Sequence, residues 1–233
     1  MHVSALGIDL SVHNEFSLSK LRGEQAIASS GCRASIVRAS VVDAPDGYGS
    51  GWFHRVAQWP LRLLPAGAVK RLSPIVASDL GEALSLLALR LLATTQSGDG
   101  LGTAAIHAGK SCRVYEVGCG EQFDLDGYLQ RLRRTSTFGG AFFGRALAGN
   151  RPWITLRIPS GLARLAALIF DRLNLTPYSI GHHELLENDN IPKINALPLI
   201  LGRPPKPIVA AFDCAGWANV IESLQENPEI SFK

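Results

Sequence analysis

Cysteine is scarce in this chain of 233 residues, and its spacing excludes the common zinc sites. None of the four cysteines belongs to a C-x-x-C pair, and no other arrangement typical of zinc ligands occurs. The four are Cys32, Cys112, Cys119 and Cys214. We therefore expect no metal site, and we expect reduced, buried thiols, as in a cytosolic protein.

Long apolar runs and strong charge are also absent. No stretch of about 18 apolar residues occurs, so the sequence predicts no transmembrane segment. The first residues lack a basic leader followed by an apolar core and a cleavage site, so no secretory signal is expected. Net charge is only +3, and the longest basic cluster, Arg131–Arg134, is interrupted by Leu132. That cluster predicts the solvated end of a helix, with a phosphate contact as the lesser alternative, and no nucleic-acid partner is expected.

Strand and helix patterns alternate along the chain. An apolar run over Val3–Ile8 predicts a buried strand, and a helix follows from a cap at Asn14 to Ser29, where Gly31 ends it. Cys32–Val42 is rich in Ile and Val and predicts a second strand, which completes a β-α-β unit. Further strands are expected at 113–117 and 153–158, a polyproline linker at 203–207, a helix buried on most sides at 79–92, and other helices at 52–64, 124–134, 159–173, 179–187 and 217–224.

Five segments resemble, in their order and spacing, the extended, atypical short-chain dehydrogenase/reductases of the NAD(P)-dependent epimerase/dehydratase type. The first is similar to the strand that carries the catalytic serine, and the second resembles the Y-x-x-S-K…G-E helix. The others resemble I-x-R-P-S, S-P-I-x-V-x-D-L-A-x-A and Y-E-L-G-G. In order, the segments are His2–Gly7, Phe16–Glu24, Ile36–Ser40, Ser73–Ala83 and Tyr115–Gly118. The most similar subgroup includes the accessory NADPH-binding subunit of respiratory complex I.

The resemblance implies the site residues. Ser4 matches the serine that orients the substrate oxygen, and Lys20 matches the lysine that lowers the pKa of a tyrosine and holds the nicotinamide ribose. The tyrosine position itself holds Phe16, which cannot transfer a proton. Arg38 and Ser40, in the strand that follows the helix, are implied to bind the cofactor together with Lys20.

The resemblance also implies an α/β fold that is the C-terminal part of a Rossmann-type parallel sheet plus a smaller mixed α/β C-terminal lobe. Residues 1–120 would be the remnant of the NAD(P)-binding domain, with an insertion at about 43–75, and residues 121–233 the lobe for a substrate or an accessory role. The glycine turn that binds pyrophosphate belongs to an earlier β-α-β unit, and no G-x-x-G-x-x-G occurs here. We therefore expect a fragment with weak or absent NAD(P) binding. It would have an open sheet edge, and it would be poorly soluble or depend on a missing N-terminal half.

Two classes of function stay open at this point. One is a weakly active or inactive NAD(P)-dependent oxidoreductase or epimerase that acts on sugar-nucleotide or quinone-like substrates. The other is a non-catalytic accessory or assembly protein of a respiratory, NADH dehydrogenase-type complex, either cytoplasmic or at the periphery of the inner membrane. Phe16 favours the second class, and the general frequency of enzymes in the family favours the first. No motif specifies a substrate or chooses between NADH and NADPH.

Two other patterns compete with this interpretation. Val114–Glu121 resembles the E-x-G-x-G-x-G turn of S-adenosylmethionine-dependent methyltransferases, but Gln122 replaces the third glycine. No acid that could bind ribose hydroxyls occurs between Asp126 and Asp171, so a methyltransferase is the lesser alternative. The helix expected at 159–173 is amphipathic and basic; packing in a lobe is favoured for it over a membrane surface.

Overall fold

Three parallel strands and one antiparallel strand form the main sheet, in the order β1-β2-β7-β6. The structure is a computed structural model that describes residues 1–9, 15–44, 46–47, 49–65, 70–93, 106–107, 111–135, 154–159, 161–162, 165 and 188–208. The strands of the sheet are β1 (His2–Ala5), β2 (Ala34–Ala39), β6 (Ile106–His107) and β7 (Cys112–Val117). The α/β class with a Rossmann-type parallel sheet, predicted from the sequence, is confirmed.

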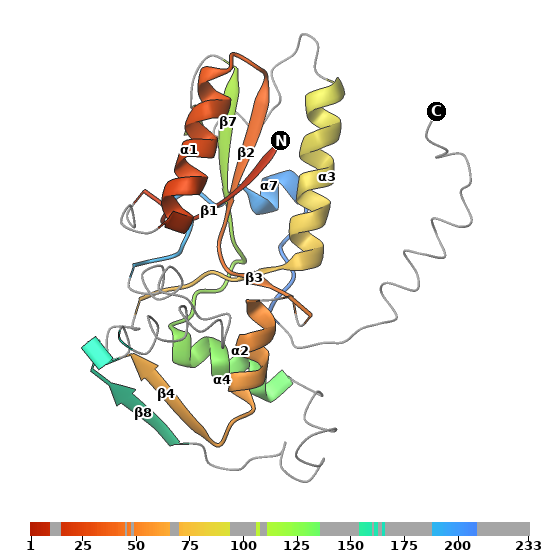
Figure 1. The fold of residues 1–233 in the computed structure, drawn as a ribbon. Helices are drawn as coiled ribbons and strands as arrows, with labels where there is room; N and C mark the ends of the chain where they lie inside the picture. Colours follow the sequence, from red (N-terminus) through yellow and green to blue (C-terminus); the bar gives the residue numbers. More distant parts are fainter. Residues whose placement is uncertain are drawn as a thin grey trace.

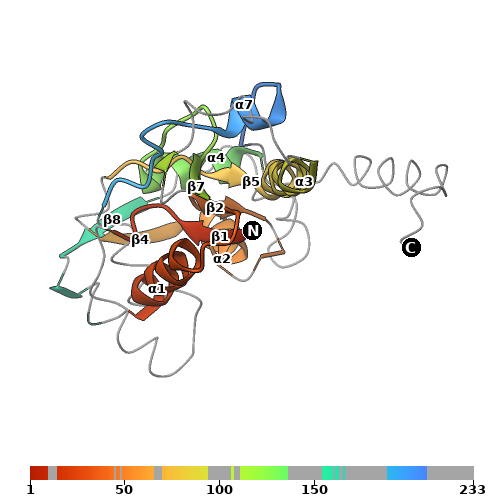
Figure 2. The same cartoon turned by 90° about the horizontal axis from the view of Figure 1, so that it is seen from above.

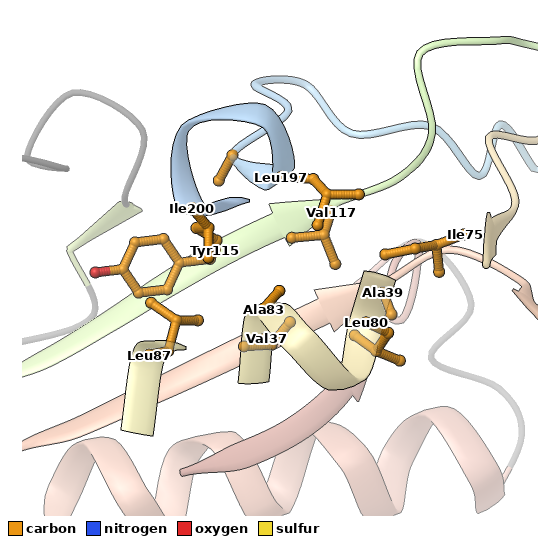
Figure 3. Packing of buried hydrophobic residues seen from close by; sticks show 11 residues of the cluster. Val37, Ala39, Ile75, Leu80, Ala83, Leu87, Tyr115, Val117, Leu197 and Ile200 are labelled. Carbon is orange, nitrogen blue, oxygen red and sulfur yellow. The ribbon is translucent and has the colours of Figure 1, made fainter. Parts of the chain in front are cut away.

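Helices cover the parallel strands on both faces. α1 (Glu15–Ser29) lies on one face, and α3 (Ala77–Ala93) and α7 (Leu197–Leu201) lie on the other (Figures 1 and 2). Strand residues therefore alternate between two apolar layers, as in a parallel sheet buried on both sides. Val37, Tyr115 and Val117 face α3 and α7 (Figure 3), whereas Ile36 and Val114 pack toward Ile27 of α1.

A second group of elements lies beyond the carboxyl ends of the main strands (Figure 1). Helices α2 (Ser50–Ala57) and α4 (Leu125–Thr135) pack against each other there, and β4 (Leu61–Pro65) pairs in parallel with β8 (Ile154–Ile158). A short parallel pair, β3 (Val42–Asp43) and β5 (Ile75–Val76), connects this group to the main sheet. The assignment of 1–120 and 121–233 to two domains stays a prediction.

The Asp43 carboxylate joins three elements of the second group. His54 Nε2 of α2 lies 2.7 Å from Asp43 Oδ1, and the Tyr128 hydroxyl of α4 donates to the same oxygen at 3.0 Å. All three side chains are buried. Burial, followed by the charge of Asp43, raises the pKa of Tyr128 well above its usual value. The three polar groups thus satisfy one another inside the α2–α4 packing.

Residues 188–208 return to the main sheet and cross the carboxyl ends of its strands. The Asn190 side chain donates from Nδ2 to Leu6 O at 3.2 Å, and the Ser40 hydroxyl lies 2.6 Å from Asn190 Oδ1. Further along, Asp79 of α3 accepts from Arg203 Nη2 at 2.9 Å and from the Lys206 amide at 2.7 Å. The polyproline stretch predicted at 203–207 is therefore anchored to α3 by a buried carboxylate.

The structure corrects three expectations. The helix expected over 52–64 ends at Ala57, because Pro60 cannot continue a helix, and Leu61–Pro65 forms β4 instead. α3 is not buried on most sides, since Leu92 is 79% exposed. Of the thiols expected to be buried, Cys32 is exposed, whereas Cys112 and Cys119 are buried. The cap at Asn14, the fourth cysteine Cys214, the helices at 179–187 and 217–224 and most of 159–173 lie outside the described residues.

Replacing Asn190 with Ala should destabilise the protein by about 2–4 kcal/mol, because Leu6 O loses its partner and the buried Ser40 hydroxyl keeps only its bond to the backbone oxygen of residue 190. Ser40→Ala should cost less, because it removes only one of these groups. Urea denaturation of both single variants and the double variant measures the coupling, which we expect to be about 1–3 kcal/mol. Strictly additive losses would contradict the contact.

Alkaline unfolding tests the Asp43 cluster. Above about pH 10 the unfolded chain releases the Tyr128 proton while the folded chain keeps it, so stability falls as the pH rises toward the raised pKa. Tyr128→Phe should cost about 1 kcal/mol at neutral pH by loss of the hydrogen bond. The variant should also lose less stability than the wild type between about pH 9 and 11. Parallel pH profiles of the two proteins in thermal melts would exclude the effect.

Candidate functional site

The predicted site residues of β1 and α1 lie together. Lys20 Nζ donates to the backbone oxygen of Val3 at 3.1 Å, immediately before Ser4 in β1. One turn earlier on the same helix face, the Phe16 ring has its centroid 5.9 Å from Lys20 Nζ. The i, i+4 spacing and the packing of α1 on β1 therefore bring Ser4, Phe16 and Lys20 to one place.

The chemistry available at this place is limited by Phe16. Its ring is 42% exposed and carries no group that can exchange a proton. The Ser4 side chain is only 4% exposed, and its hydroxyl has no hydrogen-bond partner among the described residues. Lys20 uses one of its three N–H donors on Val3 O. The ammonium group of Lys20, which retains spare donors, thus lies near the Phe16 ring, and the Ser4 hydroxyl belongs to the strand on which α1 packs.

Arg38 of β2 is engaged by its own fold. Its Nε and Nη2 donate to Glu24 Oε1 and Oε2 of α1 at 2.9 and 2.7 Å, a bidentate ion pair. Asp9 lies 3.8 Å from Nη1. The hydrogen bond to Glu24 raises the pKa of Arg38. The guanidinium predicted to bind a cofactor therefore connects α1 to the sheet, and its charge is already balanced by carboxylates.

Ser40 is engaged as well, because its hydroxyl bonds to Asn190, as described above. It is buried at the end of β2, where the residues 188–196 cross the sheet. Of the cofactor-binding residues predicted from the sequence, Lys20 keeps N–H donors for a ligand, and Arg38 keeps those of Nη1, although its charge is balanced by Glu24.

The glycine turn after β7 is filled by protein. A Cβ placed on Gly118 would lie 2.7 Å from Ser73 Oγ and 2.8 Å from Ser73 O. The Gly118 amide donates to Asn195 Oδ1, and Asn195 Nδ2 donates back to Gly118 O at 2.8 Å. Glu116 Oε2 accepts from the Lys193 amide at 2.7 Å. Gly118 is thus needed for the close approach of Ser73, which explains this glycine without a bound S-adenosylmethionine.

Sequence reasoning missed the residues that occupy these polar groups. The sequence assigns Glu24 only to the helix motif of the resemblance, whereas its position on α1 places it over Arg38. Asn190 and Asn195 carried no motif signal, because their partners lie far away in the sequence.

The described part of the chain offers neither a cluster of metal ligands nor a membrane-spanning helix. No three His, Cys, Asp or Glu side chains in that part of the chain are grouped so that they could hold a metal ion. None of its helices is long and apolar enough to span a membrane.

The chain is similar to known proteins in its fold but not in its sequence. No protein-family model matches the chain, and no curated protein matches its sequence. Its structure is similar to UDP-glucuronic acid 4-epimerase from Bacillus cereus in complex with UDP-glucuronic acid and NAD, with 12% identity and a TM-score of 0.46, over 84% of this chain and 48% of that one. It is also similar to UDP-glucose 4-epimerase from Thermotoga maritima, with 11% identity and a TM-score of 0.45, over 82% and 48%.

A third solved structure, RMD from Pseudomonas aeruginosa complexed with NADPH, has 11% identity and a TM-score of 0.45, over 88% of this chain and 60% of that one. The chain spans about half the length of the two epimerases. With TM-scores below 0.5, these likenesses carry no statement about activity, which depends on the residues themselves.

The explanation of Gly118 can be tested directly. Gly118→Ala should destabilise the protein by about 1–3 kcal/mol, because the new methyl group overlaps Ser73. Gly120→Ala is the matched control, since no atom lies within 4 Å of a Cβ at that position, and it should change stability by less than about 0.5 kcal/mol. Equal stability of both variants in denaturant titrations would refute the close approach.

Proposed function

We propose that this chain is an NAD(P)-dependent oxidoreductase- or epimerase-like protein that does not catalyse proton transfer, and that its role is that of an accessory protein. The observation that carries this proposal is Phe16, which lies next to Lys20 at the position where the resemblance implies a proton donor. The arrangement of backbone and neighbouring side chains supports a dehydrogenase-like site, and the missing hydroxyl removes its chemistry.

A site of this kind must supply both a hydride and a proton. A nicotinamide cofactor supplies or accepts a hydride when it is bound, and the accompanying proton must come from the protein. Ser4 can orient an oxygen atom by a hydrogen bond, but no base lies within hydrogen-bond distance of its hydroxyl among the described residues. Phenylalanine at position 16 therefore leaves the site able to bind and orient a ligand and unable to protonate it.

The fit to a dinucleotide is partial. Lys20 retains N–H donors that could hold ribose hydroxyls. The buried Ser4 hydroxyl has no hydrogen-bond partner among the described residues and could also bond to a ligand. Arg38 and Ser40 are already bonded to Glu24 and Asn190. Because these two residues, expected to contact the cofactor, are already bonded within the fold, we expect NADH or NADPH to bind weakly.

Restoring a hydroxyl at position 16 tests the proposal. The purified chain and its Phe16→Tyr variant are titrated with NADPH and NADH by fluorescence, and cofactor turnover is then followed with quinone and UDP-sugar substrates. We expect no turnover by the wild type. Phe16→Tyr should raise turnover on the order of 100-fold above the wild-type background, the usual effect of a positioned general acid.

Two controls define the result. Phe16→Leu removes the ring without adding a hydroxyl and should behave like the wild type. Adding Lys20→Ala to Phe16→Tyr should abolish the gain, because the ammonium group no longer lowers the pKa of the new tyrosine. Cofactor turnover by the unmodified chain would overturn the proposal of a non-catalytic role.

A further inference from the structure

The outward face of the β4–β8 ribbon is aliphatic, unlike that of an ordinary surface sheet. Leu61 pairs with Ile154, and Leu156 follows two residues later on the same face. The opposite face carries Arg62, whose side chain is 0% exposed and lies 3.3 Å from Asp126 Oδ1 of α4. Arg62 thus points inward, as does the buried Leu64 two residues later, whereas Leu61, Ile154 and Leu156 are exposed on the other face.

This outer aliphatic face, formed by Leu61, Ile154 and Leu156, is open. The three side chains are 43%, 62% and 49% exposed. Trp59, two residues before β4, is 49% exposed at the border of the face. β4 and β8 lie side by side at the end of the molecule remote from α1 (Figure 1). An open patch of neighbouring aliphatic side chains with an exposed tryptophan beside it indicates a contact surface.

Among the described residues beside the face, Arg133 and Arg157 are cationic, and the carboxylate that contacts the ribbon, Asp126, is paired with Arg62. Both strands come from stretches that contain no Asp or Glu: residues 47–78, with four Lys or Arg, and residues 127–170, with seven Arg. Arg157 of β8 is exposed, and Arg133 of α4 donates from Nη1 to Trp59 O at 2.9 Å. The partner of the outer aliphatic face must therefore accept aliphatic side chains and tolerate or attract positive charge.

We propose that the outer aliphatic face docks the protein onto an anionic lipid membrane surface. Leu61, Ile154 and Leu156 would enter the boundary of headgroups and acyl chains, with Trp59 at the headgroup level and the arginines near lipid phosphates. This goes beyond the proposed function and does not depend on a dinucleotide.

Other partners fit less well. A nucleic acid would need the charged side chains on the face itself, whereas the face is aliphatic. A second copy placed face to face would bring two cationic borders together, which repel each other. A lipid surface satisfies both observations, because it offers an apolar layer under a layer of negative charge.

Flotation of the full-length chain with vesicles tests the proposal. We expect binding to mixed phosphatidylcholine–phosphatidylglycerol vesicles, little binding to phosphatidylcholine alone, and weakening by salt. Ile154→Asp and Leu156→Asp should each lower partitioning on the order of tenfold, the change expected when one aliphatic side chain is withdrawn from apolar contact. Leu92→Asp is the matched control, because Leu92 is 79% exposed on α3, and it should bind like the wild type.

Folding is checked by circular dichroism, and because the substituted side chains are exposed, the variants should keep their structure. Failure of the wild type to bind anionic vesicles would overturn the proposal. It would also fail if Leu92→Asp lost binding as much as Ile154→Asp, or if folded Ile154→Asp bound unchanged. A wild-type dimer that Ile154→Asp dissociates, with no vesicle binding, would assign the face to a second copy instead.

Discussion

Asn190 holds together the carboxyl ends of the main sheet, and the remaining arrangement depends on it. Its amide donates to Arg71 O, its carbonyl accepts from the Ser73 amide, and its side chain contacts the ends of β1 and β2 at Leu6 and Ser40. A buried asparagine with every polar group bonded specifies one position for the segment that carries it. Because residues 188–208 are positioned in this way, α7 can cover the sheet face opposite α1.

That constraint uses polar groups that a ligand could otherwise contact. In open α/β sheets, ligands bind outside the carboxyl ends of the strands, and here Ser40 and Gly118 at those ends are bonded to Asn190 and Asn195. Arg38 is likewise paired with Glu24, so its guanidinium is also used within the fold. Ser4 and Lys20 take no part in these contacts, which serve folding.

Local pattern predicted most of the elements, and distant partners decided the rest. The strand at 113–117 and the helix at 124–134 were each predicted to within one residue of β7 and α4, because apolar spacing and turn residues lie within the segment itself. β4 was missed because its pairing with β8, more than 90 residues away, overrides the apolar pattern that looked helical. The convergence of Ser4, Phe16 and Lys20 followed from helix periodicity, whereas the bonding of Arg38 and Ser40 required the fold.

The β4–β8 ribbon buries the charged side chain of Arg62 and exposes the aliphatic side chains of its other face, and these two features are connected. The ion pair of the buried Arg62 with the partly exposed Asp126 contributes little net stability, because the loss of hydration offsets the attraction. The ribbon buries Leu64, but the apolar area of Leu61, Ile154 and Leu156 stays in water and adds little to stability. Contact of the outer aliphatic face with an apolar layer would recover the burial that the fold leaves unused.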